Sequence, residues 1–407
     1  MDWQPSAEII ELVRNLALQN ALQYEGEGQV GSVMGRIMGT RADLRQHAKQ
    51  LPKIISEEVN AANSLAKSEG LDHVREILAQ SAPEMLEKKE HVRREGLPDL
   101  PGETKGVVLR FAPNPNGPLS FGHSRGLVVN SSYAKQLSGE LILRFDDTDT
   151  TVKPPLLSAY DTIVKETEWL CGFPADRIVI ASDRMEQYHN YAEKSLNRGY
   201  AYVCTCTAED FKEFRVSKTC CPCRDRKAEE NIHHWNLMND NKGYQPGDAV
   251  VRIKTDMTLP NPALRDWPAL RIQTNPHPRI GDACRVWPLL DFQSAVEDYL
   301  QGVTHIIRGK DLMDSTRKQK LLYQHFSWQY PETIYWGRVK VHEFGGFSTS
   351  QMRRDVEEGI YSGWDDPRLP TLATLARRGI KPEALRNFWI EIGLSQKDIS
   401  VPLATLY

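Results

Sequence analysis

A glycine and a histidine stand side by side in the segment PLSFGHSRG, which covers residues 118–126. They follow a short apolar run at residues 107–109 and precede a stretch that we expect to be helical from residue 126 to 138. An anionic group can rest on the free amides of a helix N-terminus, so Gly122 and His123 are candidate phosphate ligands. For a lone glycine and histidine, a loop with a purely structural role is the alternative.

Three carboxylates follow the apolar run LILRF at residues 141–145: Asp146, Asp147 and Asp149. Like charges at this spacing are unfavourable unless a cation, an ammonium group or helix N-terminal amides compensate them. The cluster therefore fits either a pocket for an amine ligand or an ordinary helix cap.

Five of the seven cysteines lie between residues 204 and 223. The pairs CTC and CPC supply four thiols from two tight turns, which suits tetrahedral zinc with thiolates at about 2.3 Å. Four soft donors also suit an iron–sulfur cluster, and reduced free thiols are the remaining alternative. We expect structural zinc, with Cys220 outside the ligand set. The predicted ligands are Cys204, Cys206, Cys221 and Cys223.

The elements that must position these residues alternate between strand and helix. The runs 107–111 and 141–145 have strand character and are separated by a helix-length segment, which is the βαβ unit of a parallel sheet. The strand-like run 178–181 and the helix-like segment 188–199 continue the pattern, and the cysteine-rich segment 200–245 interrupts it as an insertion. The sequence therefore predicts an α/β fold, with ligands at the carboxyl ends of the strands.

The first hundred residues follow a different pattern, because Ile9, Leu12, Val13 and Leu16 repeat at the spacing of a helix face. A basic run at 88–96 and a Pro/Gly segment lead out of this region, which predicts a helical domain that ends near residue 103.

Composition sets wider limits on the function. The 407 residues are 40% hydrophobic and 26% charged, and the net charge is −3, which argues against a wholly basic nucleic-acid coat. No run approaches the ~18 apolar residues of a membrane span, and the N-terminus has no export signal. We expect a globular protein of the cytoplasm that makes no contact with a membrane.

Several motifs, taken in order, resemble the glutamyl-tRNA synthetases of the archaeal type, which are class I aminoacyl-tRNA synthetases. The motifs are RFAPNPNG, SFGH, LILRFDDTD, DWPALRI, VWPLLDFQSAVEDYLQGVTHIIRGKDL and EFGGFSTS. The resemblance spans residues 105–407 and implies a Rossmann-type catalytic domain with an inserted, zinc-bearing domain that grips the tRNA acceptor end. The implied parts are an N-terminal helical extension (1–103), two catalytic halves (104–199 and 281–345), the insertion (200–280), and a signature loop with a helical stem-contact region (346–407).

Two signatures of this family are altered here. The HIGH signature falls on residues 120–123, where Ser120 replaces the first histidine, and the KMSKS loop falls on 346–350, where both lysines are absent. In the family these loops stabilise the charge of the transition-state phosphate, and losing one such donor would cost about 2–4 kcal/mol. Hydroxyls and amides can still donate to phosphate, so we expect a working variant. The implied catalytic residues are His123, Ser120, Ser348, Thr349 and Ser350, and the implied ATP contacts are Pro113, Gly122, His123, Phe347 and Ser348.

The resemblance places Arg110 and Arg308 beside the amino acid, where two guanidiniums suit a side-chain carboxylate. It also places Asp146 on the substrate ammonium, while Leu290 and Ser294 stand where bacterial relatives have tyrosine and asparagine. The implied glutamate contacts are Arg110, Ala112, Asn114, Asp146, Leu290, Ser294 and Arg308.

The activity implied is attachment of L-glutamate to the glutamate tRNA through an adenylate, with ATP, Mg²⁺ and a structural zinc. The archaeal type also implies the glutamine tRNA as a second acceptor. Because both signatures are altered, a catalytically weakened tRNA-binding paralogue is the alternative, and the N-terminal extension disfavours a short synthetase-like tRNA modifier. The chain ends near the point where relatives begin their anticodon-binding barrels, so we expect the catalytic portion without them.

Overall fold

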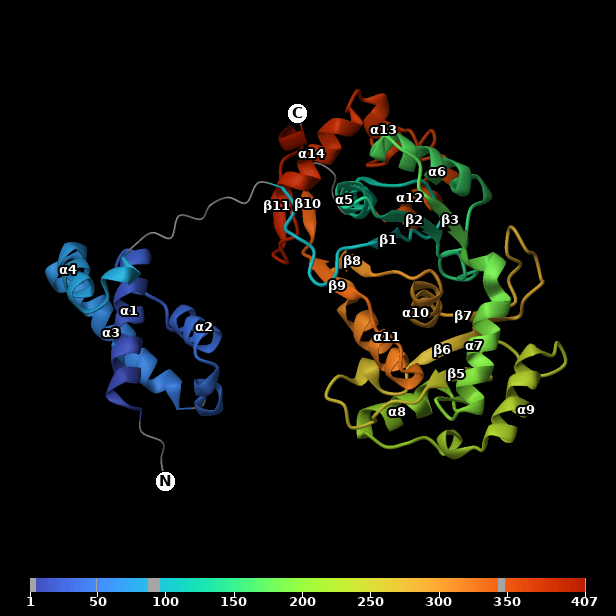
Figure 1. Cartoon of the computed structure of the whole chain (residues 1–407), viewed down its shortest axis with the longest axis horizontal. Coiled ribbons are helices and arrows are strands. Elements are labelled where there is room, and N and C mark those ends of the chain that lie inside the picture. Colours follow the sequence, from blue (N-terminus) through green and yellow to red (C-terminus); the bar gives the residue numbers. More distant parts are fainter. Residues whose placement is uncertain (1–4, 49, 87–95, 343–347, 407) are drawn as a thin grey trace. The chain divides into compact units, whose positions relative to one another are not determined.

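The computed structural model describes residues 5–48, 50–86, 96–342 and 348–406. The chain divides into two compact units, Met1–Arg93 and Arg94–Tyr407, which are described separately below (Figure 1). This division lies before the boundary predicted near residue 103. The reason is that Tyr133 donates to the Pro98 carbonyl at 2.6 Å and a ring nitrogen of His305 lies 2.8 Å from the Pro101 carbonyl, so this stretch belongs to the second unit.

The first unit is helical, as its apolar spacing predicts. Val13 and Leu16, on the predicted apolar face, are buried in a core that also holds Ile55, Val59 and Leu78. Its helices are α1 (Ala7–Gln23), α2 (Val30–Thr40), α3 (Leu51–Glu69) and α4 (Leu71–Ser81).

The second unit is built on parallel strands. β2 (Glu140–Phe145) pairs with both β1 (Val108–Phe111) and β3 (Arg177–Ile180), and β8 (His305–Gly309) pairs with β9 (Glu332–Trp336). The sheets β1-β2-β3 and β8-β9 adjoin, because Thr304 N donates to the Val108 carbonyl at 3.0 Å and so sets β8 beside β1. The spatial order is therefore β3-β2-β1-β8-β9. Such a Rossmann-type order opens a ligand crevice at the carboxyl ends of β1 and β8. The predicted α/β class is therefore confirmed.

Helix α5 (Phe121–Gln136) connects β1 to β2 and begins before residue 126, where we predicted its start. Ser120 is its N-cap residue with extended backbone, and Phe121 N donates to the Pro370 carbonyl at 2.8 Å. Leu119 N donates to Glu166 Oε2 at 2.7 Å. These long-range contacts, which local periodicity does not reveal, start the helix early and place Gly122 and His123 in its first turn.

The predicted insertion (200–280) holds most of an antiparallel sheet with strand order β4-β5-β6-β7, and the sheet continues past residue 280 because β7 pairs with β6. The buried Trp267 and Trp287 anchor its core, together with residues of α7 and α10. Its strands are β4 (Ala201–Cys204), β5 (Val250–Ile253), β6 (Pro268–Ile272) and β7 (Val286–Pro288), and its helices are α8 (Ala208–Ser217) and α9 (Ala228–Asn239). The flanking helices are α7 (Met185–Asn197) and α10 (Leu290–Leu300).

The C-terminal part folds back onto the catalytic sheet. Trp389 donates to Ser124 Oγ at 2.7 Å, and β10 (Val339–Val341) pairs in parallel with β11 (Ile399–Val401). Its helices lie beside α5 and α6 in Figure 1. The remaining helices of this unit are α6 (Leu157–Cys171), α11 (Met313–Phe326), α12 (Thr349–Glu357), α13 (Leu372–Arg377) and α14 (Pro382–Ile392).

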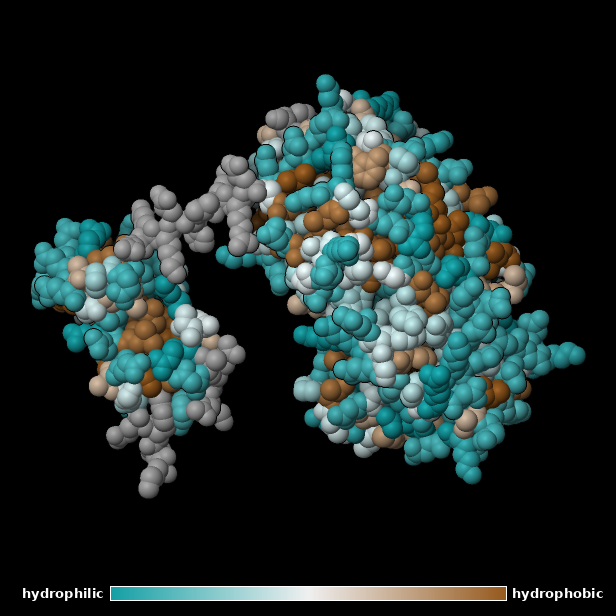
Figure 2. Space-filling model, in the orientation of Figure 1, coloured by the Kyte–Doolittle hydropathy of each residue, from teal (hydrophilic) through white to brown (hydrophobic). Residues whose placement is uncertain are grey.

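The surface of the second unit in Figure 2 is mostly hydrophilic, with hydrophobic residues gathered near α6 and β3. Ile178 on β3 and Leu157 on α6 are among the exposed apolar residues. Within the described part of the chain, no helix is both long and apolar enough to cross a membrane.

Candidate active site

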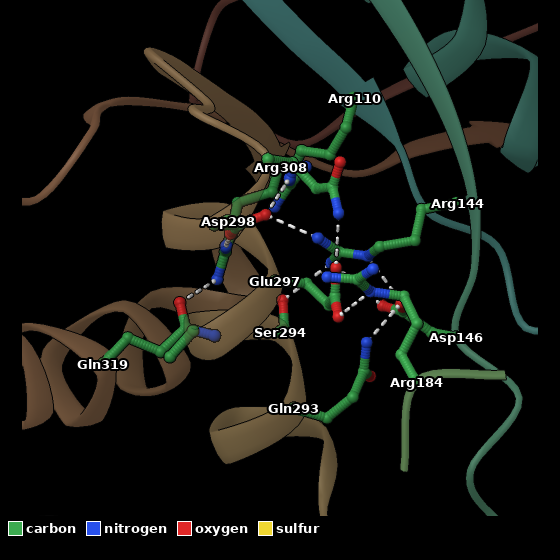
Figure 3. A network of polar contacts seen from close by, with 12 residues as sticks. Arg110, Arg144, Asp146, Arg184, Gln293, Ser294, Glu297, Asp298, Arg308 and Gln319 are labelled. Carbon is green, nitrogen blue, oxygen red and sulfur yellow. Dashed lines mark hydrogen bonds and ion pairs between the residues drawn. The ribbon is translucent and has the colours of Figure 1, made fainter. Parts of the chain in front are cut away.

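Two arginines at the carboxyl ends of neighbouring strands share one buried carboxylate (Figure 3). Arg110 of β1 donates from Nε to Asp298 Oδ1 at 3.1 Å, and Arg308 Nη2 of β8 lies 3.9 Å from Asp298 Oδ2. All three side chains are buried. Burial and the nearby charge of Arg110 lower the pKa of Arg308, but a guanidinium remains a cation at neutral pH.

A third arginine, Arg144 of β2, completes the network. It donates to Asp298 Oδ1 at 2.6 Å, to both carboxylate oxygens of Asp146 at 2.7 and 3.2 Å, and to Ser294 Oγ at 2.9 Å. Gln293 donates to Asp146 Oδ1 at 2.8 Å. Asp146 and Ser294 are therefore fixed in place before any ligand arrives.

Five residues of this network line a cavity of about 200 Å³, called the first cavity here: Arg110, Arg144, Asp146, Ser294 and Arg308. Arg308 Nη1 donates to Gln319 at 3.2 Å, whereas Arg308 Nε and Nη2 are buried and have no hydrogen-bond partner among the described residues. Two unsatisfied donors on one buried cation are costly unless a ligand accepts from them. The predicted residues that line the first cavity are Arg110, Ala112, Asp146, Leu290, Ser294 and Arg308.

The three clustered aspartates separate in the structure. Asp146 lines the first cavity. Asp147 accepts from Tyr160 and from both the amide and the hydroxyl of Ser182. Asp149 accepts from backbone amides of its own turn at 2.9 and 3.0 Å. The charge is thus compensated locally, by Arg144 at Asp146, by Arg271 at 3.4 Å from Asp149, and by hydrogen bonds, and of the three only Asp146 lines the first cavity.

The two altered signature segments meet at a second cavity. Ser120, Gly122 and His123 line it from α5, and Ser348 and Thr349 line it from the start of α12. Ser348 caps α12 by accepting from Gln351 N at 3.2 Å. Gly346 and Phe347, also predicted in this loop, lie outside the described residues.

His123 is held as a neutral donor. Its Nδ1 accepts from Ser120 N at 3.2 Å, so the proton of the neutral ring is assigned to Nε2. Burial, and to a lesser extent the charge of Lys153, lower the pKa of His123 to about 4. At neutral pH the ring therefore offers one N–H, as a hydrogen-bond donor without a full charge.

Three further predicted residues are not among those that line the first or the second cavity. Ser350 Oγ accepts from Asn116 at 3.3 Å. Pro113 is buried, and its carbonyl accepts from Asp146 N at 3.1 Å. Asn114 Oδ1 is buried and has no partner among the described residues.

The four predicted cysteine ligands come together at the end of β4 and the turn before α9. Their sulfur atoms all lie within 4.8 Å of one another, and the Cys204–Cys221 and Cys206–Cys223 pairs are 3.9 and 3.7 Å apart. Tetrahedral zinc with thiolates at about 2.3 Å requires sulfur separations of about 3.8 Å, so this donor set fits zinc.

Four residues of the site escaped the sequence analysis. Arg144 and Gln319 line the first cavity, Asp298 accepts from its arginines, and Glu166 holds the segment before Ser120. Arg144 gave one usable signal, since it is a charged residue inside the apolar strand LILRF. Asp298 and Glu166 sit on helices where an acidic residue is ordinary.

The strand order and the position of the cavities are typical of one class of enzyme. The sequence profile described as "tRNA synthetases class I (E and Q), catalytic domain" matches residues 106–404. A solved glutamate-tRNA synthetase from Elizabethkingia anophelis has this fold, with a TM-score of 0.53 and 20% identity over 74% of this chain and 69% of that one.

Close sequence relatives narrow the family. The chain is 47% identical to the glutamate–tRNA ligase of Methanothrix thermoacetophila and 49% identical to that of Methanosarcina mazei. The matches cover 98% and 99% of this chain and 70% of each relative. The chain therefore belongs to the archaeal-type glutamate–tRNA ligases of the class I aminoacyl-tRNA synthetases, as its motifs predict.

Proposed function

We propose that the protein joins L-glutamate to the glutamate tRNA in two steps. A carboxylate oxygen of glutamate attacks the α-phosphorus of ATP, and pyrophosphate leaves. A hydroxyl of the terminal adenosine of tRNA then attacks the acyl carbon of the adenylate, and AMP leaves. The names of the archaeal relatives support glutamate as the amino acid; the glutamine tRNA as a second acceptor is part of the proposal.

The observation that carries this proposal is the pair of free donors on Arg308. A buried guanidinium whose Nε and Nη2 donate no hydrogen bond among the described residues is prepared for a bidentate carboxylate. Arg110 adds a second cation on the same wall of the first cavity. Asp146 would accept from the substrate ammonium, and Ser294, Leu290, Ala112 and Asn114 would shape the rest of the glutamate site.

ATP, with its Mg²⁺, would occupy the second cavity. The Gly122 amide and the Nε2–H of His123 would donate to phosphate, together with the hydroxyls of Ser348, Thr349 and Ser350. Ser120 would support His123 by capping α5, which is a role that serine performs well. Pro113 and Phe347 complete the proposed ATP contacts.

The function is tested by pyrophosphate exchange and by charging. We expect pyrophosphate exchange that requires glutamate, ATP and tRNA together. We also expect charging of the glutamate tRNA, and the glutamine tRNA is tested in parallel as a second acceptor. The assay is repeated with the full-length natural protein. If that protein binds tRNA but shows no pyrophosphate exchange, it is the weakened paralogue instead.

We also propose that the four cysteines hold structural zinc, which would stiffen the insertion where it meets the tRNA acceptor end. Metal analysis is expected to give about one zinc per chain, and chelation to unfold the insertion before adenylate formation is affected. Cys206→Ser should lose the metal. Cys220→Ser is the matched control, because Cys220 is exposed and lies outside the cluster. If the protein is purified under reducing conditions and metal analysis finds no zinc in it, the assignment is contradicted.

A further inference from the structure

One lysine beside the second cavity has no partner. Lys340 is the central residue of β10 and is exposed, and it lines the second cavity together with His123 and Ser348. It also lines a neighbouring third cavity, with Gly122 and Asp311. Among the described residues, none forms a hydrogen bond or an ion pair with its ammonium group. The side chain is therefore free to meet a ligand.

The second cavity is short of positive charge without this residue. The KMSKS-like segment at 346–350 contains no lysine, and Ser120 stands in place of a histidine. His123 is neutral at neutral pH, because burial lowers its pKa to about 4. Of the described residues that line this cavity, Lys340 alone carries a charge. A triphosphate carries several negative charges, which hydroxyl and amide donors do not neutralise.

The strand that carries Lys340 is firmly held. Arg338 N donates to Asp398 Oδ1 at 2.6 Å, and Gly337 N donates to the Ser395 carbonyl at 2.9 Å. The Gly337 carbonyl in turn accepts from the buried Arg125 at 2.6 Å, and any side chain at Gly337 would collide with the Lys397 carbonyl. The backbone from which the Lys340 side chain extends is therefore fixed beside the second cavity.

We infer that Lys340 is a catalytic residue whose ammonium group contacts the phosphates of ATP and takes the place of the missing signature lysines. This inference rests on the proposed function. As the glutamate oxygen bonds to the α-phosphorus, the bond from that phosphorus to the bridging oxygen breaks, and the electron pair goes to pyrophosphate. Lys340 keeps its proton and stabilises the charge that gathers on the leaving pyrophosphate.

Lys153 is one competing source of charge; Arg125 and Arg338 line the third cavity but not the second. Lys153 is close enough to lower the pKa of His123, but it is not among the lining residues of the second or third cavity. The geometry therefore favours Lys340, and a Lys153 variant distinguishes the two.

The test uses the full-length protein and the variants Lys340→Met, Lys340→Arg, Lys153→Met and Lys397→Met. Lys397 is the matched control, because it is exposed on the neighbouring segment and outside these cavities. Steady-state pyrophosphate exchange gives kcat and KM for ATP and for glutamate, and calorimetry gives the affinity for ATP with Mg²⁺. We expect Lys340→Met to lower kcat/KM for ATP by about 10- to 100-fold. Lys340→Arg should recover most of it, and the KM for glutamate should stay within about twofold of wild type.

Two outcomes would overturn the assignment. Lys340→Met could match wild type and Lys397→Met, or Lys153→Met could show the larger loss. If wild type binds ATP but exchanges no pyrophosphate, only the proposed function fails. The role of Lys340 is then tested by calorimetry alone, and it is refuted if Lys340→Met binds ATP as tightly as wild type does. If wild type does not bind ATP at all, both fail.

Discussion

Replacing His123 with alanine is expected to slow glutamyl-adenylate formation by roughly a hundredfold or more, as the removal of one preorganised donor does. The altered signatures leave few donors at the phosphate, and His123 is the one imidazole N–H lining the second cavity among the described residues. Single-turnover formation of the adenylate measures the effect. Binding of tRNA should remain nearly unchanged, because the insertion that we propose meets the tRNA acceptor end lies elsewhere in the fold.

Matched variants separate chemistry from folding in this experiment. His123→Gln keeps a side-chain amide that can donate, so part of the rate should return if a donor is what matters. Ser120→His should have a smaller effect than His123→Ala, since Ser120 contributes mainly as the helix cap. A rate for His123→Ala within a few fold of wild type, with an unchanged melting temperature, would show that the ring does not contact the reacting phosphate.

Replacing Arg308 with alanine is expected to lower kcat/KM for glutamate by roughly 30-fold or more. This corresponds to at least ~2 kcal/mol, because a charged hydrogen bond to the side-chain carboxylate is lost. The KM for ATP should change much less, since ATP is proposed to occupy the second cavity. Steady-state pyrophosphate exchange at varied glutamate measures both constants.

Two controls sharpen the result. Arg308→Lys keeps the charge but not the planar pair of donors, so it should recover only part of the activity if the carboxylate binds in bidentate geometry. Arg317→Ala removes a surface arginine of α11 that pairs with Asp314, and it should leave both constants unchanged. Unaltered glutamate kinetics in Arg308→Ala would remove Arg308 from the amino-acid site.

Features written within short stretches of the chain could be predicted from the sequence. The spacing of the four cysteines implied one cluster, and the structure brings their sulfur atoms together. The alternation of apolar runs predicted the parallel sheet, and the ordered motifs identified the family. Such features survive in the sequence because the residues that act together are close along the chain or follow the period of one element.

Only the tertiary structure decided which distant residues meet. Asp298 lies 188 positions from Arg110, yet it joins Arg110 and Arg144 because α10 packs against the ends of their strands. Lys340 reaches the cavity of His123 through the pairing of β10 with β11. Helix α5 begins at Phe121 because Phe121 N donates to the Pro370 carbonyl and Leu119 N donates to Glu166, and both partners are remote in sequence. Periodicity determines which face of an element is apolar, but it does not determine which other element covers that face. The positions of Asp298 and Lys340 at the cavities therefore follow from the packing of distant elements.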